Sequence, residues 1–365
     1  MTRELVVSVD GMGGDNAPQA VIDGLAIAHV RFPKAKFLLH GDHSQLQSIL
    51  LSRPALKNVT QIVHCDDVVG MEDKPSQALR RGRNTSMWRA IDSVRNKDAQ
   101  VVVSAGNTGA LMAMAKVQLR TVPGLSRPAI ACLWPTIRGQ SVVLDVGANI
   151  DTDARQLFDF AIIGEAYARV VLGLDRPSVG LLNVGAEEMK GNEVVKAAAQ
   201  ALRSSGLPMR FHGFIEGDDI SLGTVDVVVT SGFTGNIALK TAEGTARLIG
   251  HYIRSAMARS FLSRIGYVFS RSGFNVLRQK LDPRAANGGV FLGLNGVVVK
   301  SHGGTDGLGF AAAIDLAIEM GGSDFVQRVA DAMAHLPASG MALDGSKSDP
   351  VLAQEASAPV EVASS

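Results

Sequence analysis

Short apolar runs rich in β-branched residues recur along the chain, and each ends in a polar loop that is followed by a helical pattern. Strands that are apolar on both faces and alternate with helices are typical of a mainly parallel sheet covered by helices on both sides. The sequence therefore predicts a doubly wound α/β fold. The expected strands are Leu5–Asp10, Val101–Ser104, Val142–Asp145, Val179–Leu182, Val225–Thr230 and Val297–Lys300.

These units continue to about residue 335, and we interpret residues 1–335 as a single α/β domain. Between Leu336 and Ser365 the composition shifts to Ala, Ser, Pro and Gly with scattered acids, which is typical of a disordered C-terminal tail. The first strand begins almost at the N-terminus, without a secretory leader before it. No apolar stretch reaches the ~20 residues that a membrane-spanning helix needs. We therefore expect a cytoplasmic protein.

Charge and cysteine content exclude several classes of function. The formal net charge is only +1, so the field of the whole chain does not favour nucleic acid. The two cysteines, Cys65 and Cys132, are too few for a disulfide scaffold or a multi-cysteine zinc site. Cys132 lies in an apolar run and is expected to be buried, while Asp66 and Asp67 disfavour a thiolate at Cys65. We predict no catalytic thiol and no metal site.

Glycine-rich polar loops follow the strands, where ligands bind in parallel α/β sheets. In the first loop, residues 10–18, three glycines allow backbone N–H groups to approach an anion at a helix N-terminus. Asn16 replaces the third glycine of the dinucleotide pattern. One such loop is equally compatible with a tight turn, but four of them predict a shared cleft for a phosphate group. The other three loops are Ser104–Ala110, Gly147–Asn149 and Gly232–Asn236.

Two side chains near these loops are candidates for charge and proton chemistry. Lys190 lies between an expected strand and an expected helix, although most lysines in such loops are solvated surface residues. His302 directly follows the last expected strand, and it is equally compatible with a helix-entry or core histidine.

Taken together, the loop segments resemble the phosphate acyltransferase family of bacterial phospholipid synthesis, the acyl-acyl-carrier-protein:phosphate acyltransferases. The resemblance extends from residue 10 to about residue 320. It departs at Ser231, where the family usually has an Asp before Gly-Phe-Thr-Gly-Asn. The matching segments are Asp10–Pro18, Lys74–Ser76, Ser104–Ala110, Leu144–Asn149, Gly180–Gly185, Lys190–Glu193, Gly232–Lys240 and Leu292–Gly303.

The resemblance implies a fold similar to isopropylmalate dehydrogenase and phosphotransacetylase. It also implies a homodimer that uses no cofactor and associates peripherally with the membrane. The implied reaction moves a fatty acyl group from acyl carrier protein to inorganic phosphate, giving acyl phosphate for phospholipid synthesis. Phosphate is already an oxyanion near neutral pH, and a thiol with a pKa near ~8.5 leaves readily, so no strong general base is needed. The site has to position phosphate and stabilise a tetrahedral oxyanion.

On this basis we assign roles as hypotheses. Lys190 binds phosphate and offsets developing charge, and Asn236 and Asn107 donate hydrogen bonds to phosphate or to the oxyanion. His302 protonates or orients the leaving sulfur, and the carboxylates of Asp10 and Asp15 order the first glycine loop. The residues assigned to substrate or phosphate binding are Asp10, Gly13, Gly14, Asp15, Asn107, Thr108, Asn149 and Thr234.

Three alternatives are open. A metal- and NAD-dependent decarboxylating dehydrogenase of the same fold would need an Asp-x-x-x-Asp helix pattern beside an arginine cluster, which the chain lacks. A non-enzymatic lipid-binding scaffold would not need four phosphate-type loops. The third alternative is acyl transfer from coenzyme A, because the residues do not distinguish coenzyme A from acyl carrier protein as the acyl donor.

Residues 254–281 combine basic and apolar side chains at helical spacing. Gly266 and Gly273 interrupt the pattern, which predicts a protruding helical hairpin instead of one rod. A basic amphipathic helix suits contact with an anionic membrane and with an acidic carrier protein, although packing on the core or on a dimer partner is the commoner fate. The predicted contact residues are Phe261, Arg264, Ile265, Phe269 and Arg271.

Overall fold

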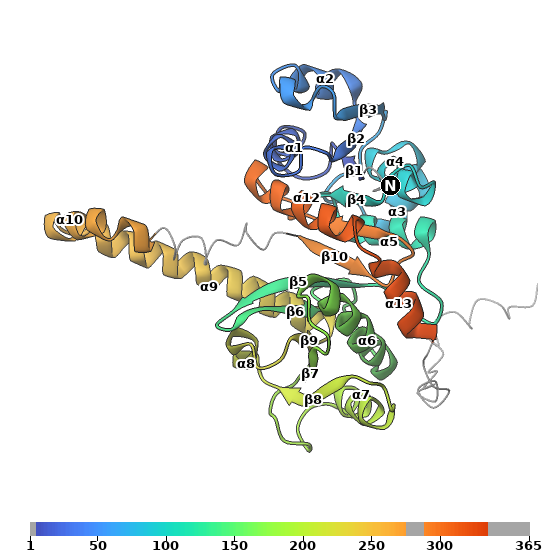
Figure 1. The fold of residues 1–365 in the computed structure, drawn as a ribbon, viewed down its shortest axis with the longest axis vertical. Coiled ribbons are helices and arrows are strands. Elements are labelled where there is room, and N and C mark those ends of the chain that lie inside the picture. Colours follow the sequence, from blue (N-terminus) through green and yellow to red (C-terminus); the bar gives the residue numbers. More distant parts are fainter. Residues whose placement is uncertain (1–4, 275–287, 335–365) are drawn as a thin grey trace, which may run out of the picture.

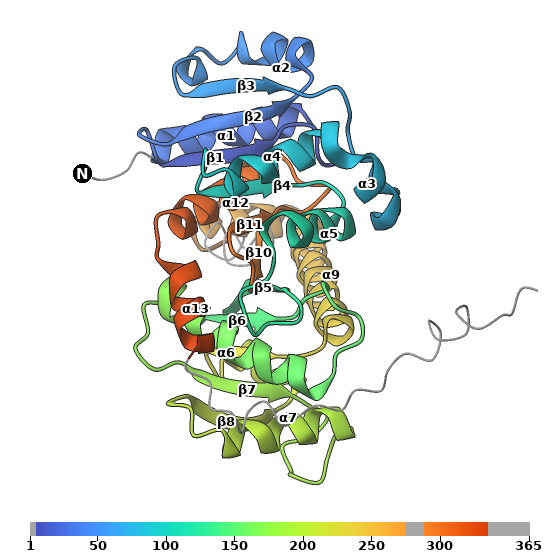
Figure 2. The same ribbon diagram turned by 90° about the vertical axis from the view of Figure 1, so that its right-hand side faces the viewer.

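The computed structural model describes residues 5–274 and 288–334 of the chain. Its strands are β1 Val6–Asp10, β2 Lys36–Gly41, β3 Thr60–His64, β4 Val101–Ser104, β5 Ala129–Thr136, β6 Gly139–Leu144, β7 Ser178–Leu182, β8 Arg210–Ile215, β9 Val227–Val229, β10 Gly289–Leu292 and β11 Val297–Lys300. They form one eleven-stranded sheet in the order β3-β2-β1-β4-β11-β10-β5-β6-β9-β7-β8. Figure 2 shows the strands stacked in this order along the long axis of the molecule.

Helices cover both faces of this sheet. One apolar cluster packs α1, α6, α7, α12 and α13 on one face, and a second packs α3, α4, α5, α8 and α9 on the other. The predicted doubly wound α/β fold is therefore confirmed. The helices are α1 Gln19–Arg31, α2 His43–Leu50, α3 Pro75–Arg81, α4 Ser86–Arg95, α5 Thr108–Leu119, α6 Ala154–Val171, α7 Glu193–Ser204, α8 Gly217–Leu222, α9 Gly232–Ala258, α10 Phe261–Phe269, α12 Gly307–Gly321 and α13 Phe325–Ala334, with 3-10 turns at Pro54–Leu56 and Gly82–Asn84.

Strand direction divides the sheet into two groups. The first strand group, β3, β2, β1, β4 and β11, is parallel throughout. The second strand group, β6, β9, β7 and β8, is also parallel throughout. Between them β10 and β5 pair antiparallel with every neighbour, which makes three reversals from β11 to β6. Because three is odd, the two groups run in opposite directions. We call the carboxyl ends of the first group the first edge, and those of the second group the second edge.

A long helical extension leaves the body of the molecule. α9 has 27 residues and carries α10 at its far end (Figure 1). The helices separate at Ser260, whose hydroxyl accepts a hydrogen bond from the Ser263 N–H at 3.1 Å. The prediction of a break at Gly266 is wrong, because Gly266 lies inside α10. Residues 275–281 of the predicted hairpin and the predicted tail at 336–365 lie outside the described residues.

Candidate active site

Asp10 ties together the loops of the first edge. Its buried carboxylate at the end of β1 accepts hydrogen bonds from the hydroxyls of Ser86 at 2.6 Å and Ser104 at 2.7 Å. The Ser104 hydroxyl in turn accepts from the Gly106 N–H at 3.0 Å. Burial raises the pKa of Asp10, whereas its hydrogen bonds act in the opposite direction. The loop after β1 is thereby fixed to the loop after β4.

The glycines of the first loop permit this close approach. A Cβ at Gly13 would meet the Asp10 carboxylate and lie 2.8 Å from the Gly106 nitrogen, so a side chain does not fit there. Gly14 has a φ of +102°, in the region that favours glycine. The N–H of Asp15 then donates to the Gly303 carbonyl at 2.9 Å, which joins this loop to the loop after β11.

Asn107 and Thr108 stand where α5 begins. The Asn107 Oδ1 accepts from the Ala110 N–H at 3.0 Å and caps the helix. Its Nδ2 donates to the carbonyls of Met71 at 2.8 Å and Asp73 at 3.0 Å. The Asn107 amide is thus committed to the protein, and in this structure it positions the loop at residues 70–73. The half-buried Thr108 is the first residue of α5.

Lys300 is a site residue that the sequence analysis did not single out. It ends β11, two residues before the exposed His302, and its amine donates to the carbonyls of Ala105, at 3.2 Å, and Ser301. Burial lowers the pKa of Lys300 to about 8, although the charges of Asp10 and Asp15 act in the opposite direction. The sequence contained a signal for Lys300, because it is a polar residue at the end of an apolar strand, as Asp10 is.

Asp145 organises the second edge. It follows β6, is fully buried, and was likewise not selected from the sequence. Five N–H donors surround it, whereas burial raises the pKa of its carboxyl. The Oδ1 accepts from the backbone of Ile130 at 3.1 Å, Gly147 at 3.1 Å and Ala148 at 2.9 Å, and the Oδ2 from the backbone of Asn149 at 2.7 Å and its Nδ2 at 2.9 Å. Asn149 is therefore buried and structural in its contacts.

The first turn of α9 packs directly on this Asp145 loop. Gly232 and Gly235 face the carbonyls of Asn149 and Asp145 with no space for a Cβ. Ser231, at the position of the family's usual Asp, caps the helix, because its hydroxyl accepts from the N–H of the exposed Thr234 at 3.4 Å. A hydroxyl thus fills the capping position.

Asn236 and Lys190 carry the available donors of the second edge. Asn236 is half-buried in the first turn of α9, beside Gly147. Lys190 is exposed in the loop after β7, which the Asn183 Nδ2 holds by donating to the carbonyls of Gly185 and Lys190, both at 3.1 Å. Within residues 5–274 and 288–334, the side chains of Asn236 and Lys190 have no hydrogen-bond or ion-pair partner.

The predicted site residues follow two strand groups that run in opposite directions, and their sharing of one cleft stays a prediction. Asp10, Gly13, Gly14, Asp15, Asn107, Thr108 and His302 lie at the first edge, whereas Asn149, Lys190, Thr234 and Asn236 lie at the second edge. The antiparallel strands β10 and β5 reverse the direction between the two groups.

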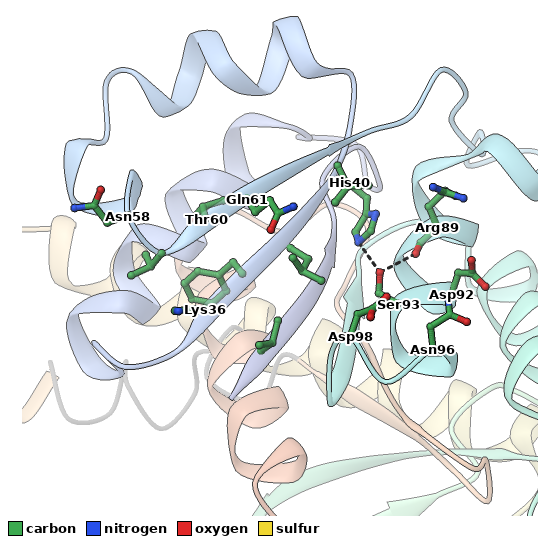
Figure 3. Close-up of a pocket in the computed structure, with 15 residues that line it drawn as sticks. Lys36, His40, Asn58, Thr60, Gln61, Arg89, Asp92, Ser93, Asn96 and Asp98 are labelled. Carbon is green, nitrogen blue, oxygen red and sulfur yellow. Dashed lines mark hydrogen bonds between the residues drawn. The ribbon is translucent and has the colours of Figure 1, made fainter. Parts of the chain in front are cut away.

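A groove of about 740 Å³ lies elsewhere, under β2 and β3 beside α4 (Figure 3). Lys36, His40, Arg89 and Ser93 line it, and none of the predicted site residues does. The buried His40 Nε2 is 3.3 Å from the Ser93 hydroxyl, and burial lowers the pKa of His40 to about 4. Residues of β1, β2, β3 and α4 contribute to this groove, and its lining is distinct from the residues of the candidate site.

Other features bear on the class of chemistry. Cys65 and Cys132 are unpaired and buried, and burial raises their pKa values to about 11 and about 12, so the prediction that neither is a reactive thiolate is supported. Over the described residues, no three His, Cys, Asp or Glu side chains gather closely enough to hold a metal ion. In the same part of the chain, no helix combines the length and apolar character needed to cross a bilayer.

Comparison with known proteins places the chain among relatives of high sequence identity. The family described as "Fatty acid synthesis protein" matches residues 5–328. A phosphate acyltransferase from Parvibaculum lavamentivorans is 57% identical over 97% of this chain and 98% of its own length. One from Xanthobacter autotrophicus is 59% identical over 90% and 93%, respectively.

Two solved structures share the fold at low identity. A phosphotransacetylase from Streptococcus pyogenes has a TM-score of 0.59 at 14% identity and covers 88% of this chain and 95% of its own. EutD phosphotransacetylase from Staphylococcus aureus has a TM-score of 0.54 at 15% identity, with the same coverage of 88% and 95%. Because the family match spans most of the chain and the relatives exceed half identity over nearly their full length, the chain belongs to the phosphate acyltransferase family.

Proposed function

We propose that the protein transfers a fatty acyl group from acyl carrier protein to inorganic phosphate, and that the acyl phosphate serves phospholipid synthesis. Membership of the family supports an acyltransferase. The observation that carries the finer proposal is a pair of donors, Lys190 and Asn236, that have no side-chain partner among the described residues and lie beside glycine-rich loops at helix N-termini. Such loops bind an oxyanion through backbone N–H groups.

The proposed reaction requires little proton transfer. An oxygen of phosphate attacks the thioester carbon, the tetrahedral intermediate collapses, and the C–S bond breaks while the new C–O bond remains. Lys190 holds the phosphate charge, and Asn236 donates to phosphate or to the intermediate's oxyanion, whose stabilisation is commonly the largest catalytic effect. The sulfur leaves as a thiolate and takes up a proton, with His302 as the donor on this proposal.

The first prediction tests this reaction. The purified protein should release free thiol from long-chain acyl carrier protein only when phosphate is present, because phosphate is the acceptor and the loops carry no hydrolytic triad. Thiol release is measured with a chromogenic disulfide, and acyl phosphate is trapped with hydroxylamine. Equal release in phosphate-free buffer would identify a thioesterase. The same acyl chain on coenzyme A, offered in competition, identifies the donor.

The extension formed by α9 and α10 supports a peripheral membrane contact in this proposal. Phe261 and Phe269 expose 77% and 84% of their surface on α10, and Arg271 is exposed just beyond it. Ile265 is exposed to a lesser degree on the same helix. An apolar face with nearby arginines suits both anionic headgroups and an acidic carrier protein. We propose that both are partners of this tip.

The second prediction tests the membrane contact. Replacing Phe261 and Phe269 together by Ser should reduce flotation with anionic vesicles, because apolar area at the tip is lost, and should leave thiol release in solution largely unchanged. The matched control replaces Val30 and Leu51 by Ser. These two side chains are exposed to 83% and 74%, respectively, on another part of the surface. If the tip variant floats as well as the parent, α10 is not the anchor.

A further inference from the structure

We infer that the acyl carrier protein of the proposed reaction docks on a strip of positive charge beside the first edge. The inference rests on the proposed function, because the carrier protein is the acyl donor of that reaction. The strip lies along α3, the 3-10 turn at Gly82–Asn84 and the start of α4 (Figure 2). We call it the basic strip, and it consists of the exposed side chains of Lys74, Arg80, Arg81, Arg83 and Arg89.

The positive charge of the basic strip is not neutralised by its neighbours in the sequence. Residues 74–91 contain five basic residues and no acidic one. In the part of the chain that the structure describes, none of the five side chains has a hydrogen-bond or ion-pair partner. The next acid along the chain, Asp92, pairs with Arg95. Unpaired surface charges of one sign attract a partner of the opposite sign and speed its association.

The acids of this region lie in the loop before the basic strip. Two of them are engaged there, because the Asp66 carboxylate is 3.1 Å from the Nε2 of His64 and Asp73 accepts from the Gly70 N–H at 2.8 Å. The sign of the charge therefore changes at Lys74, which gives an acidic partner one preferred side on which to bind. The acids of the loop are Asp66, Asp67, Glu72 and Asp73.

The beginning of the basic strip is fixed to α5 at the first edge. Asn107, which caps α5, donates from its Nδ2 at 3.0 Å to the carbonyl of Asp73, the residue before Lys74. A Cβ at Gly109 would lie 2.8 Å from the Pro75 side chain, so α3 begins in contact with the first turn of α5. A partner bound at Lys74 therefore borders the loop after β4.

The end of the basic strip is fixed to the loop after β1. Ser86 is the first residue of α4, and its hydroxyl donates to the buried carboxylate of Asp10 at 2.6 Å. Arg89 lies about one turn further along this helix, where its N–H donates to the Thr85 carbonyl at 3.0 Å. The backbone of the strip is thus anchored at both ends to loops of the first edge.

An apolar surface connects the loop before the basic strip with the predicted site residue His302. Met71 and Val68 are exposed in this loop. Met71 lies against Gly303, in the loop that holds His302. A carrier protein on the strip brings an apolar acyl chain, and contact with these side chains removes apolar area from water.

The basic strip fits an acidic protein better than a bilayer. The large apolar side chains of this segment are not exposed, because Met87 is buried and Leu79 and Trp88 are half-buried. A helix that binds a membrane surface inserts apolar side chains, as Phe261 and Phe269 on α10 are placed to do. Opposite charge alone is sufficient to attract and orient an acidic protein.

The contact proposed for the tip serves a different step. Figure 1 shows α10 at the far end of α9, away from α3, α4 and α5. The 27 residues of α9 span about 40 Å at 1.5 Å per residue. A carrier protein gathered at the tip therefore has to move to reach the first edge, whereas the basic strip borders that edge.

The test removes three charges of the basic strip. Arg80→Gln, Arg81→Gln and Arg83→Gln are combined in one triple variant, because glutamine keeps a high helix propensity without the charge. We expect the KM for long-chain acyl carrier protein to rise about tenfold, since each exposed ion pair contributes up to a few-fold in affinity. The kcat should stay near the parental value. The KM for the same acyl chain on pantetheine should also be unchanged, because that donor has no acidic protein.

The matched control removes three charges at the opposite end of the same strands. Lys34, Lys57 and Lys97 precede β2, β3 and β4, are exposed, and have no side-chain partner among the residues described. With all three changed to Gln, the control has the net charge of the triple variant, and its KM for the carrier protein should be parental. An equal rise in both proteins would mean that only overall charge matters, which contradicts the inference. Thermal unfolding verifies that both variants are folded.

Binding is also measured without the reaction, by anisotropy of a fluorescently labelled carrier protein that bears no acyl chain. The triple variant should bind it about tenfold more weakly than the parent and the control, and binding by the parent should weaken as salt is added. If binding depends on the strip but no donor releases thiol, only the proposed reaction fails. If thiol is released while the triple variant binds like the parent, the reaction stands and the docking inference is wrong.

Two further results would overturn the inference. One is a parent protein that does not bind the carrier protein at all. The other is a triple variant that binds the carrier protein normally but floats poorly with anionic vesicles, which would assign the basic strip to the membrane.

Discussion

Replacing Lys190 by Ala is expected to lower turnover by roughly 10²-fold or more, the usual effect of removing one preorganised donor from an oxyanion site. The amine is exposed on the loop after β7 and has no partner among the described residues, so it is available for phosphate. Folding should survive, because the loop is fixed through Asn183 and not through the lysine side chain. The measurement is kcat and KM for phosphate, with thermal unfolding as a check on the fold.

Asn236→Ala should show a loss of similar size, and it separates two roles. A fall in kcat at unchanged KM for phosphate indicates a donor to the oxyanion, whereas a rise in KM indicates phosphate binding.

The matched control for Lys190→Ala is Lys196→Ala on α7, because Lys196 pairs with Glu193 at 2.9 Å and should have no catalytic role. Near-normal turnover of Lys190→Ala at subsaturating phosphate would make Lys190 a surface lysine.

Replacing Asp145 by Asn is expected to destabilise the protein by about 3 kcal/mol or more. Five N–H groups point at the two carboxylate oxygens, and the amide nitrogen of an asparagine would face donors in place of an acceptor. The loop that this carboxylate holds also supports the first turn of α9. The loss of ordered structure in the loop should therefore also displace Asn236. A protein of this size should unfold several degrees lower.

The control for this experiment lies in the same loop. Asp151→Asn changes the same side chain at an exposed position, so it should leave the unfolding temperature within about a degree of the parent. Thermal unfolding followed by circular dichroism provides the comparison. An Asp145→Asn protein as stable as the Asp151→Asn protein would mean that the buried donors find other acceptors at little cost.

Several strands that are buried on both faces were predictable from sequence. β4 and β11 have the expected bounds, because four consecutive valine-rich residues with no exposed face leave few alternatives. The start of the helix α6, Ala154–Val171, also has a signal in the sequence, because Asp153 and Gln156 form a capping box. By contrast, the sequence analysis did not predict β2, β3, β5, β8 and β10. Of these, β3 and β8 are the edge strands of the sheet and carry exposed polar residues.

The individual loops of the site were also predictable, but their mutual placement was not. A run of glycines in the sequence indicates close packing of the backbone, and Gly13 and Gly14 do lie where neighbouring loops leave little space for a Cβ. Nothing in the apolar run of β5 or β10 distinguishes antiparallel from parallel pairing, although that pairing decides which edge each loop occupies. Asn107 illustrates a second limit, because its bonds to Met71 and Asp73 join positions more than 30 residues apart.

The helix α9 has a consequence for how an insoluble product travels. Asn236 lies in its first turn, and its last turn adjoins α10 with the exposed Phe261 and Phe269. Its 27 residues span about 40 Å at 1.5 Å per residue. On the proposed function, a single rigid helix therefore sets the height of the reaction above the bilayer. The acyl phosphate must cover that height shielded from water, and each residue added to α9 would raise the reaction by about 1.5 Å and turn the tip by about 100°.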